Sequence, residues 1–331
     1  MTDAEFSLMT HVEMPRMARR ITTGDAMVFL GSCFAEHIGE RLLSYALPVL
    51  CNPVGTLYNP ASIRALLSAA CDPLPDGGPR PLPLFPTAKG TEWRCWLAAT
   101  GLAAPSRTAC ETLMNERLDA LARSLAQSRY LFVTLGTSVC YRLRESGQTV
   151  ANCHKMPAAL FEEQRLTTAE CVEALSDIVR IAQAQNPDVE VLFTVSPYRY
   201  QKYGFHGSQL AKATLLLAVD EVCRRHSDCC LYLPVYEIFM DELRDYRYYA
   251  ADMLHPSEVA IEVVWRRLVA ECMSERLQHY LSDYEPIRRG LAHRPLAPDS
   301  ESYRTFMAEL DQKRLDLKSQ YGIQDIDRFI H

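Results

Sequence analysis

Residues 26–38, AMVFLGSCFAEHI, hold the strand, turn and helix that decide the fold. Positions 26–30 form an unbroken apolar run, which is typical of a strand buried on both faces of a sheet. The run stops at Gly31 and Ser32, and apolar side chains then recur at helical spacing at Phe34, Ile38 and Leu42. The sequence therefore predicts a buried strand that turns tightly into a helix.

The same order of strand and helix recurs along the chain. Further apolar strands are predicted at 130–135, 190–195 and 230–235. Helices are predicted at 61–70, 111–128, 167–185, 208–226, from 257 onward, and at 301–321. Apolar strands that alternate with helices predict an α/β fold, namely a doubly wound, mostly parallel sheet with helices on both faces.

Three segments interrupt this pattern. Residues 139–150 predict a β-hairpin insertion that turns at Ser146 and Gly147. Residues 72–86 contain six prolines and predict a surface excursion, and residues 284–298 look irregular. We expect one domain over residues 1–283, with its core at about 26–270, and a C-terminal helical extension over residues 284–331.

The composition is that of an ordinary globular chain. The 331 residues are 48% hydrophobic and 23% charged, which excludes a disordered chain or a disulfide-stapled miniprotein. The formal net charge is −6, so no basic excess is present to neutralise phosphates. We therefore expect no nucleic acid among the partners.

The cysteines and the apolar runs bear on the compartment. The chain has twelve cysteines, none in a Cys-x-x-Cys spacing, which favours buried free thiols in a reducing compartment over zinc or redox motifs. Residues 1–20 lack the apolar core of a secretory signal, and the longest apolar run, 215–219, is far too short to span a membrane. These features predict a cytoplasmic protein with no membrane partner.

Polar residues gather directly after the predicted strands, where ligands of parallel sheets usually bind. Ser32 follows the first strand and opens a helix, so its hydroxyl is a candidate nucleophile near backbone N–H groups that can hold an oxyanion. Gly31 leaves room for a substrate carbonyl. The competing interpretation is that Ser32 is an ordinary N-cap of the helix.

A second candidate group lies late in the chain, at residues 252–256, DMLHP. Asp252 and His255 are three residues apart before a helix, so the carboxylate can bond to the imidazole and fix its tautomer. The competing interpretation is an N-cap aspartate beside a surface histidine. A metal site is a weaker alternative, because no third ligand lies at a fixed spacing, and we expect none.

The chain resembles the GSCFA family, which is itself similar to the SGNH (GDSL-like) hydrolases. The resemblance covers about residues 27–260 and is carried by several short motifs. These are Gly31-Ser32-Cys33-Phe34-Ala35, Asn52-Pro53-Val54-Gly55-Thr56-Leu57-Tyr58-Asn59-Pro60, Gly136-Thr137-Ser138, Asn152-Cys153-His154-Lys155, Ser196-Pro197, Gly204-Phe205-His206-Gly207 and Asp252-Met253-Leu254-His255-Pro256. It implies a flavodoxin-like three-layer sandwich.

The resemblance also implies roles for individual residues. Ser32 matches the nucleophile, His255 the general base and acid, and Asp252 its partner. The oxyanion donors would be the backbone N–H groups of Ser32 and Gly55. The asparagine usual in the third block is absent from residues 136–138, so the third donor would be Ser138, or Asn152 reaching in from the hairpin.

Four further residues are candidates to bind substrate near the carboxyl ends of the predicted strands. His154 and Lys155 are candidates to bind an anionic or sugar group, with a solvated loop as the alternative. Arg199 and His206 are candidates to shape the substrate pocket. Lys212 is expected to be a surface or capping residue. Cys33 is expected to be buried under the turn, with a reactive thiol at a helix N-terminus as the alternative.

These observations predict a serine-dependent ester hydrolase or O-acyltransferase that works through an acyl-enzyme. By resemblance the acyl group is small and the alcohol is a small molecule or a carbohydrate. No metal or organic cofactor is needed. The alternative is a ligand-binding or regulatory module that has kept the fold but lost the chemistry, since fold does not dictate function. The charged helix at 301–321 fits either a cap on the domain or a contact in a homo-oligomer.

Overall fold

A five-stranded parallel sheet forms the centre of the protein in the computed structural model, which describes residues 10–72, 80–87, 89–293 and 300–323. Its strands are β1 (Met27–Gly31), β2 (Val49–Cys51), β5 (Tyr130–Leu135), β9 (Glu190–Val195) and β10 (Cys230–Tyr232). All four pairings are parallel, and the spatial order is β10-β9-β5-β1-β2. This is the flavodoxin order. Strand β2 is added on one side of β1, and β5, β9 and β10 are added on the other side, so the order of strands reverses between β1 and β5.

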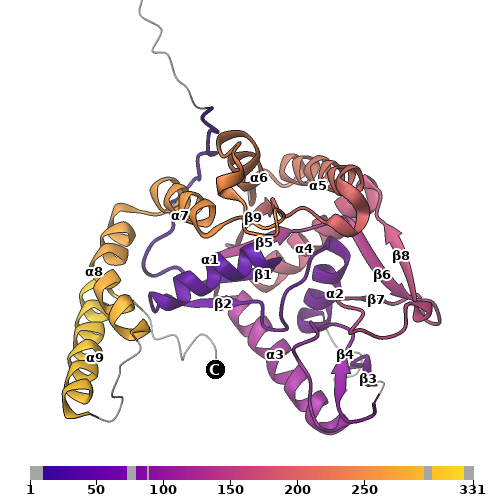
Figure 1. The fold of residues 1–331 in the computed structure, drawn as a ribbon, viewed down its shortest axis with the longest axis horizontal. Helices are drawn as coiled ribbons and strands as arrows, with labels where there is room; N and C mark the ends of the chain where they lie inside the picture. Colours follow the sequence, from indigo (N-terminus) through magenta and orange to yellow (C-terminus); the bar gives the residue numbers. More distant parts are fainter. Residues whose placement is uncertain (1–9, 73–79, 88, 294–299, 324–331) are drawn as a thin grey trace, which may run out of the picture.

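Helices cover both faces of this sheet (Figure 1). The helices of the first half are α1 (Cys33–Ser44), α2 (Pro60–Cys71), α3 (Arg107–Gln127) and α4 (Thr168–Gln185). The second half adds α5 (Gly204–Arg225), α6 (Val235–Glu237), α7 (Glu258–Cys272), α8 (Glu275–Ala292) and α9 (Glu301–Tyr321), together with a π-helical turn, η4 (Ile238–Glu242), and short 3₁₀ turns that include η3 (Gln201–Tyr203). The predicted doubly wound α/β sandwich is confirmed.

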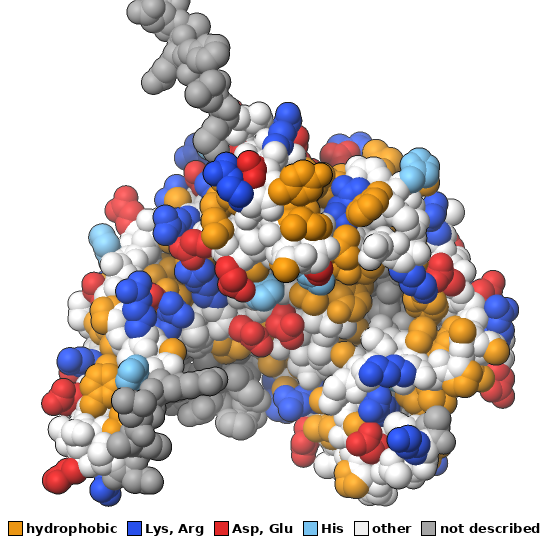
Figure 2. All heavy atoms as spheres, viewed as in Figure 1, with side chains coloured by type: hydrophobic (Ala, Val, Ile, Leu, Met, Phe, Trp, Pro, Cys, Tyr) orange, Lys and Arg blue, Asp and Glu red, His pale blue; other side chains and the backbone are white. Residues whose placement is uncertain are grey.

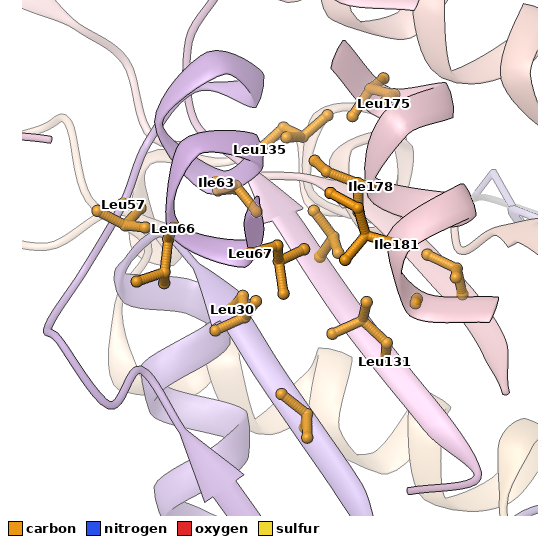
Figure 3. Close-up of a cluster of buried hydrophobic side chains, with 14 of the residues drawn as sticks. Leu30, Leu57, Ile63, Leu66, Leu67, Leu131, Leu135, Leu175, Ile178 and Ile181 are labelled. Atoms are coloured by element: carbon orange, nitrogen blue, oxygen red, sulfur yellow. The ribbon is translucent and has the colours of Figure 1, made fainter. Parts of the chain in front are cut away.

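Alternation along each strand divides the core into two layers. Val28 and Leu30 of β1 pack with α2, α3, α4 and α5, whereas Met27 and Phe29 pack with α1, α7 and α8. Figure 3 shows the first layer, where leucines and isoleucines of α2 and α4 fill the space over β1 and β5. Burial on both faces explains why the strands have continuous apolar sequences.

The predicted hairpin is present and belongs to a larger unit. Strand β6 (Val139–Leu143) pairs antiparallel with β7 (Thr149–Val150) and also with β8 (Phe161–Arg165), a strand that the sequence pattern does not predict. Within β8 four of five side chains are polar, so the strand lacks an apolar signal. A second small sheet joins β3 (Leu84–Pro86) to β4 (Trp93–Cys95) at the end of the Pro-rich excursion, of which residues 73–79 lie outside the described residues.

The C-terminal region corrects one expectation. Residues 284–292 are not irregular, because α8 continues through Pro286 to Ala292, and residues 294–298 lie outside the described part. Tyr284 and Ile287 are buried in the second core layer, and this packing outweighs the missing N–H of the proline. Helix α9 has the predicted bounds 301–321, and its Leu310 packs against Gly290 of α8. The expected domain boundary at 283/284 therefore falls inside α8.

All twelve cysteines lie in the described part, and all are free thiols. Burial raises the pKa of most of these thiols, with values of about 12 for Cys51, Cys95 and Cys171. Among the described residues no helix is both long and apolar enough to cross a bilayer.

Candidate functional site

The end of β1 places Ser32 at the point where the strand order reverses. Gly31 has φ +134°, and a Cβ there would lie 2.2 Å from the carbonyl oxygen of Thr134 on the neighbouring strand. This close approach allows only glycine. The backbone N–H of Ser32 then donates to the same carbonyl at 3.0 Å, and α1 begins at the next residue.

The Ser32 side chain is available for chemistry. Ser32 occupies the N-cap position of α1, with φ −72° and ψ 175°, but its hydroxyl makes no capping hydrogen bond. The residue is only 3% exposed, and its Oγ has no hydrogen-bond partner among the described residues. A buried hydroxyl usually finds a partner, so one left free in a pocket is a candidate reactive group. The N-cap interpretation therefore holds for its position but not for its bonding.

Asp252 and His255 form the predicted pair. The Asp252 Oδ2 lies 2.5 Å from His255 Nδ1, and its Oδ1 accepts from the backbone N–H groups of His255 and Leu254. These bonds, chiefly those from His255, lower the pKa of the Asp252 carboxyl to about 2. Met253, between them, has φ +58°, which marks a tight turn. Ser257, not Asp252, caps α7, so the N-cap interpretation of Asp252 is wrong.

Ser32 and His255 line the same pocket, which has a volume of about 280 Å³. The pocket is walled by aromatic and apolar side chains, and its lining residues are Ser32, Cys33, Phe34, His37, Tyr58, Ser196, Tyr198, Tyr200, His255, Pro256 and Ile261. In Figure 2 histidine and hydrophobic side chains lie together at the centre of the face, where Figure 1 has α1 and β1. The fold thus joins residues 223 positions apart (255 − 32) in one hollow.

The Ser32 hydroxyl and the imidazole of His255 are not hydrogen-bonded to each other. Such bonds are often long without substrate and tighten when it binds. The ring of Tyr198 packs on that of His255, with centroids 4.2 Å apart, and holds the imidazole from one side. Because Nδ1 is bonded to Asp252, Nε2 is the nitrogen left to act as a base.

The structure places the four expected oxyanion donors as follows. The N–H of Ser32 is bonded to Thr134, and the N–H of Gly55 donates to the Asn52 carbonyl at 2.8 Å. Ser138 is fully buried, its hydroxyl has no partner among the described residues, and it lies outside the pocket lining. Asn152 lines a neighbouring groove, where its Oδ1 accepts from Thr100 and from the N–H of His154. Both backbone donors are therefore occupied.

Other N–H groups lie at the start of α1, on residues that line the pocket. Helices leave their first N–H groups without intrahelical acceptors, and Cys33 and Phe34 hold the first two positions of this 12-residue helix. Both residues line the pocket, and neither N–H has an acceptor in the described part of the chain. The helix dipole adds partial positive charge there. This helix start can stabilise a negative oxygen beside Ser32.

The residues predicted to bind substrate lie outside the pocket. His154 is 5% exposed and packs edge-on against Phe85 and Trp96, and its burial lowers its pKa to about 4. Lys155 is exposed on the same loop, and His206 is exposed on α5. Arg199 lines a separate groove and lies over the ring of Phe205.

Lys212 is not at the surface, contrary to expectation. It is fully buried, and its Nζ donates to the carbonyls of Gly136 at 2.6 Å and Ser196 at 2.5 Å, the residues that follow β5 and β9. Burial, with a contribution from Arg199, lowers the pKa of Lys212 to about 7. The amine joins two adjacent strand ends next to the pocket, which secures its rim.

The tyrosines that line the pocket have no predicted role in the sequence. Tyr58 belongs to the loop after β2, and Tyr198 and Tyr200 follow β9 directly. Their position just after strand ends was the available signal. Among the described residues, no group of three or more His, Cys, Asp or Glu side chains could hold a metal ion.

The strand order and the pocket define a flavodoxin-like α/β protein with a serine and an Asp-bonded histidine at the switch point of the sheet. The GSCFA family pattern matches residues 26–268, and the pattern of the GSCFA domain protein C-terminal domain matches residues 284–328. The chain belongs to the GSCFA family. No curated protein sequence matches it.

Two solved structures are distantly similar to the chain. One is an acetyl xylan esterase (Est2A) from the rumen bacterium Butyrivibrio proteoclasticus, with 12% identity and a TM-score of 0.32, covering 76% of this chain and 64% of that one. The other is a family two carbohydrate esterase from Clostridium thermocellum in complex with cellohexaose, with 13% identity, a TM-score of 0.30, and coverage of 77% and 65%. The chain spans less than two thirds of either protein, and a likeness this distant assigns it no activity.

Proposed function

We propose that the chain is a serine-dependent ester hydrolase or O-acyltransferase that acts on a small acyl ester through an acyl-enzyme. One observation carries the proposal: the buried, unpartnered hydroxyl of Ser32 shares a pocket with His255, whose Nδ1 is bonded to Asp252. A nucleophile, a base and an orienting carboxylate are the parts that such catalysis requires. The pocket volume of about 280 Å³ favours a small acyl group.

In the proposed mechanism Ser32 Oγ attacks the ester carbonyl carbon, and its proton passes to Nε2 of His255. The negative oxygen is held by the N–H groups of Cys33 and Phe34 at the start of α1. The bond to the alcohol then breaks, and His255 returns the proton to the departing oxygen. Water or an acceptor hydroxyl next attacks the acyl-enzyme and gives its proton to His255, which passes it back to Ser32. Asp252 stabilises the imidazolium throughout.

The test is labelling with a fluorophosphonate, which reacts with activated serine hydroxyls. We expect the wild-type protein to be labelled and Ser32→Ala to lose the label. Ser196→Ala is the matched control, because Ser196 lines the same pocket but its Oγ accepts a hydrogen bond from the N–H of Tyr198. An unlabelled wild type, or a label that survives in Ser32→Ala, would refute the proposal.

The ligand-binding module remains the second candidate, and one observation favours it. The N–H groups of Ser32 and Gly55 are already bonded to backbone carbonyls, so the expected oxyanion site is not free. A module of this kind would bind an ester in the pocket without turning it over. Calorimetric binding of an ester with no labelling and no product would select this candidate.

We also propose a reducing, cytoplasmic location. The support is that all twelve cysteines are free thiols and that seven of them are buried. Such a thiol content is usual where glutathione and thioredoxin keep cysteines reduced.

A further inference from the structure

A second hollow adjoins the pocket on the side of the β6–β7–β8 sheet. This hollow, here called the hairpin groove, has a volume of about 620 Å³. Tyr58 and Tyr200 line both the pocket and the groove, and their rings meet edge to face with centroids 6.3 Å apart. The two hollows therefore share this pair of rings as part of their walls, so they lie next to each other.

The groove combines aromatic faces with hydrogen-bonding groups. The rings of Tyr200 and Tyr203 lie nearly parallel, 28° apart, and Tyr141 faces the same hollow from β6. The Asn152 amide also lines the groove; its Oδ1 is occupied, whereas its Nδ2 has no acceptor in the described part of the chain. Apolar surfaces with a few convergent polar groups are typical of small-molecule sites.

Two of the three charged side chains that line the groove, Lys202 and Glu163, pair with each other, whereas the third, Arg144, has no ion pair among the described residues. Lys202 Nζ lies 2.7 Å from the carboxylate of Glu163 and 4.6 Å from the centre of the Tyr141 ring. The carboxylate also accepts from the Tyr141 hydroxyl at 2.5 Å, and these contacts lower the pKa of Glu163. The groove therefore presents neutral phenols, an amide, a paired carboxylate and the Arg144 guanidinium, and these hydrogen-bonding groups suit hydroxyl groups better than a purely apolar chain.

We propose that the hairpin groove binds the alcohol part of the ester and that this alcohol is a sugar ring. A pyranose offers an apolar C–H face to stack on tyrosine rings and a rim of hydroxyls for amide and carboxylate groups. Tyr203 is the stacking residue in this arrangement. It is partly exposed and lies apart from the buried cluster of Phe85, Trp96, Val150 and Phe161 that holds the hairpin together. This inference rests on the proposed esterase function for its account of the acyl group.

The experiment compares a panel of methyl pyranoside monoacetates with 4-nitrophenyl acetate in steady-state kinetics. We expect Tyr203→Ala to lower kcat/KM for the best pyranoside acetate at least ten-fold more than for 4-nitrophenyl acetate, mainly by raising KM. Tyr203→Phe keeps the ring and should restore most of the loss. The matched control is Tyr246→Ala, because Tyr246 is 80% exposed and lines neither hollow. Equal losses on both esters, or no loss on either, would overturn the proposal.

A binding measurement separates this proposal from the catalytic one. Ligand-observed NMR with Ser32→Ala and the unacetylated methyl pyranosides requires no turnover. Binding that is lost when Tyr203→Ala is added supports the groove even if the wild-type protein hydrolyses nothing, in which case only the proposed esterase function fails. Absence of pyranoside binding in a folded Ser32→Ala protein overturns the groove proposal.

Discussion

Replacing Cys33 by proline removes one backbone N–H at the helix start together with the thiol, and Cys33→Ala removes the thiol alone. Cys33 is the first residue of α1, the helix position at which proline is most favoured. A proline restricts the preceding residue to extended conformations, and Ser32 already has φ −72° and ψ 175°. The Cys33 N–H has no acceptor in the part of the chain that the structure describes, so no protein hydrogen bond is lost there. The substitution therefore tests the proposed oxyanion donor with the backbone in place.

The expected loss follows from the chemistry of the oxyanion. Removing one donor to a developing oxyanion typically lowers kcat by about 10²–10³, or roughly 3–4 kcal/mol in the barrier. Cys33→Ala retains the N–H and loses only the thiol, including its 3.8 Å contact with the Tyr58 hydroxyl, and should keep kcat within about three-fold. Stability should not fall in Cys33→Pro, because proline at a compatible site typically adds about 0.4–1 kcal/mol.

The assay is single-turnover release of 4-nitrophenol from 4-nitrophenyl acetate, with thermal unfolding measured on the same samples. A Cys33→Pro enzyme with wild-type acylation would show that the helix start does not hold the oxyanion. Equal losses in Cys33→Pro and Cys33→Ala would instead assign the effect to the thiol.

Three further predictions concern single side chains. Asp252→Asn should lower kcat about 10⁴-fold, because the imidazole loses the carboxylate that sets its tautomer; steady-state kinetics showing less than a ten-fold loss would contradict this. Gly31→Ala should destabilise the fold by at least about 2 kcal/mol in urea unfolding, because its Cβ would lie 2.2 Å from the Thr134 carbonyl and φ is +134°; a smaller change would mean that the turn can relax. Burial lowers the pKa of His154 to about 4 in the folded protein, against 6.5 in model compounds. Between these two pH values the unfolded chain binds more protons than the folded protein, so the free energy of unfolding should fall by up to about 3 kcal/mol as the pH drops from 6.5 to 4. His154→Asn, which tolerates the left-handed backbone at φ +50°, should lose that part of the pH dependence, and an unchanged slope would place the titration elsewhere.

Features that depend only on residues close together in the sequence, namely the buried strands and the pair of Asp252 and His255, were predictable. Strands β1, β5 and β9 are buried on both faces, so each has a continuous apolar sequence that stands out. The pair of Asp252 and His255 is equally local, because three residues of one turn bring the two side chains together. Their spacing alone was enough to predict the bond between them.

What the sequence could not show depends on distant contacts. Lys212 is charged and would be expected in solvent, but the carbonyls of Gly136 and Ser196 accept from its buried amine. His154 follows an asparagine in a polar loop, but the aromatic rings of Phe85 and Trp96 enclose it. In both cases the deciding partners come from other elements of the fold, so no local pattern could reveal them.

The proposed oxyanion site depends on one contact between two strands. In the register of the sheet Gly31 of β1 lies opposite Thr134 of β5. The Thr134 carbonyl accepts a hydrogen bond from the N–H of Ser32, which continues the pairing of the two strands. A serine whose N–H completes a sheet cannot offer that N–H to substrate without breaking the bond. The free donors are then those one and two residues further on, where α1 has begun and where its dipole adds to their effect. The glycine that lets the strands approach so closely is therefore also the reason why we propose the helix start, and not the N–H of Ser32, as the oxyanion site.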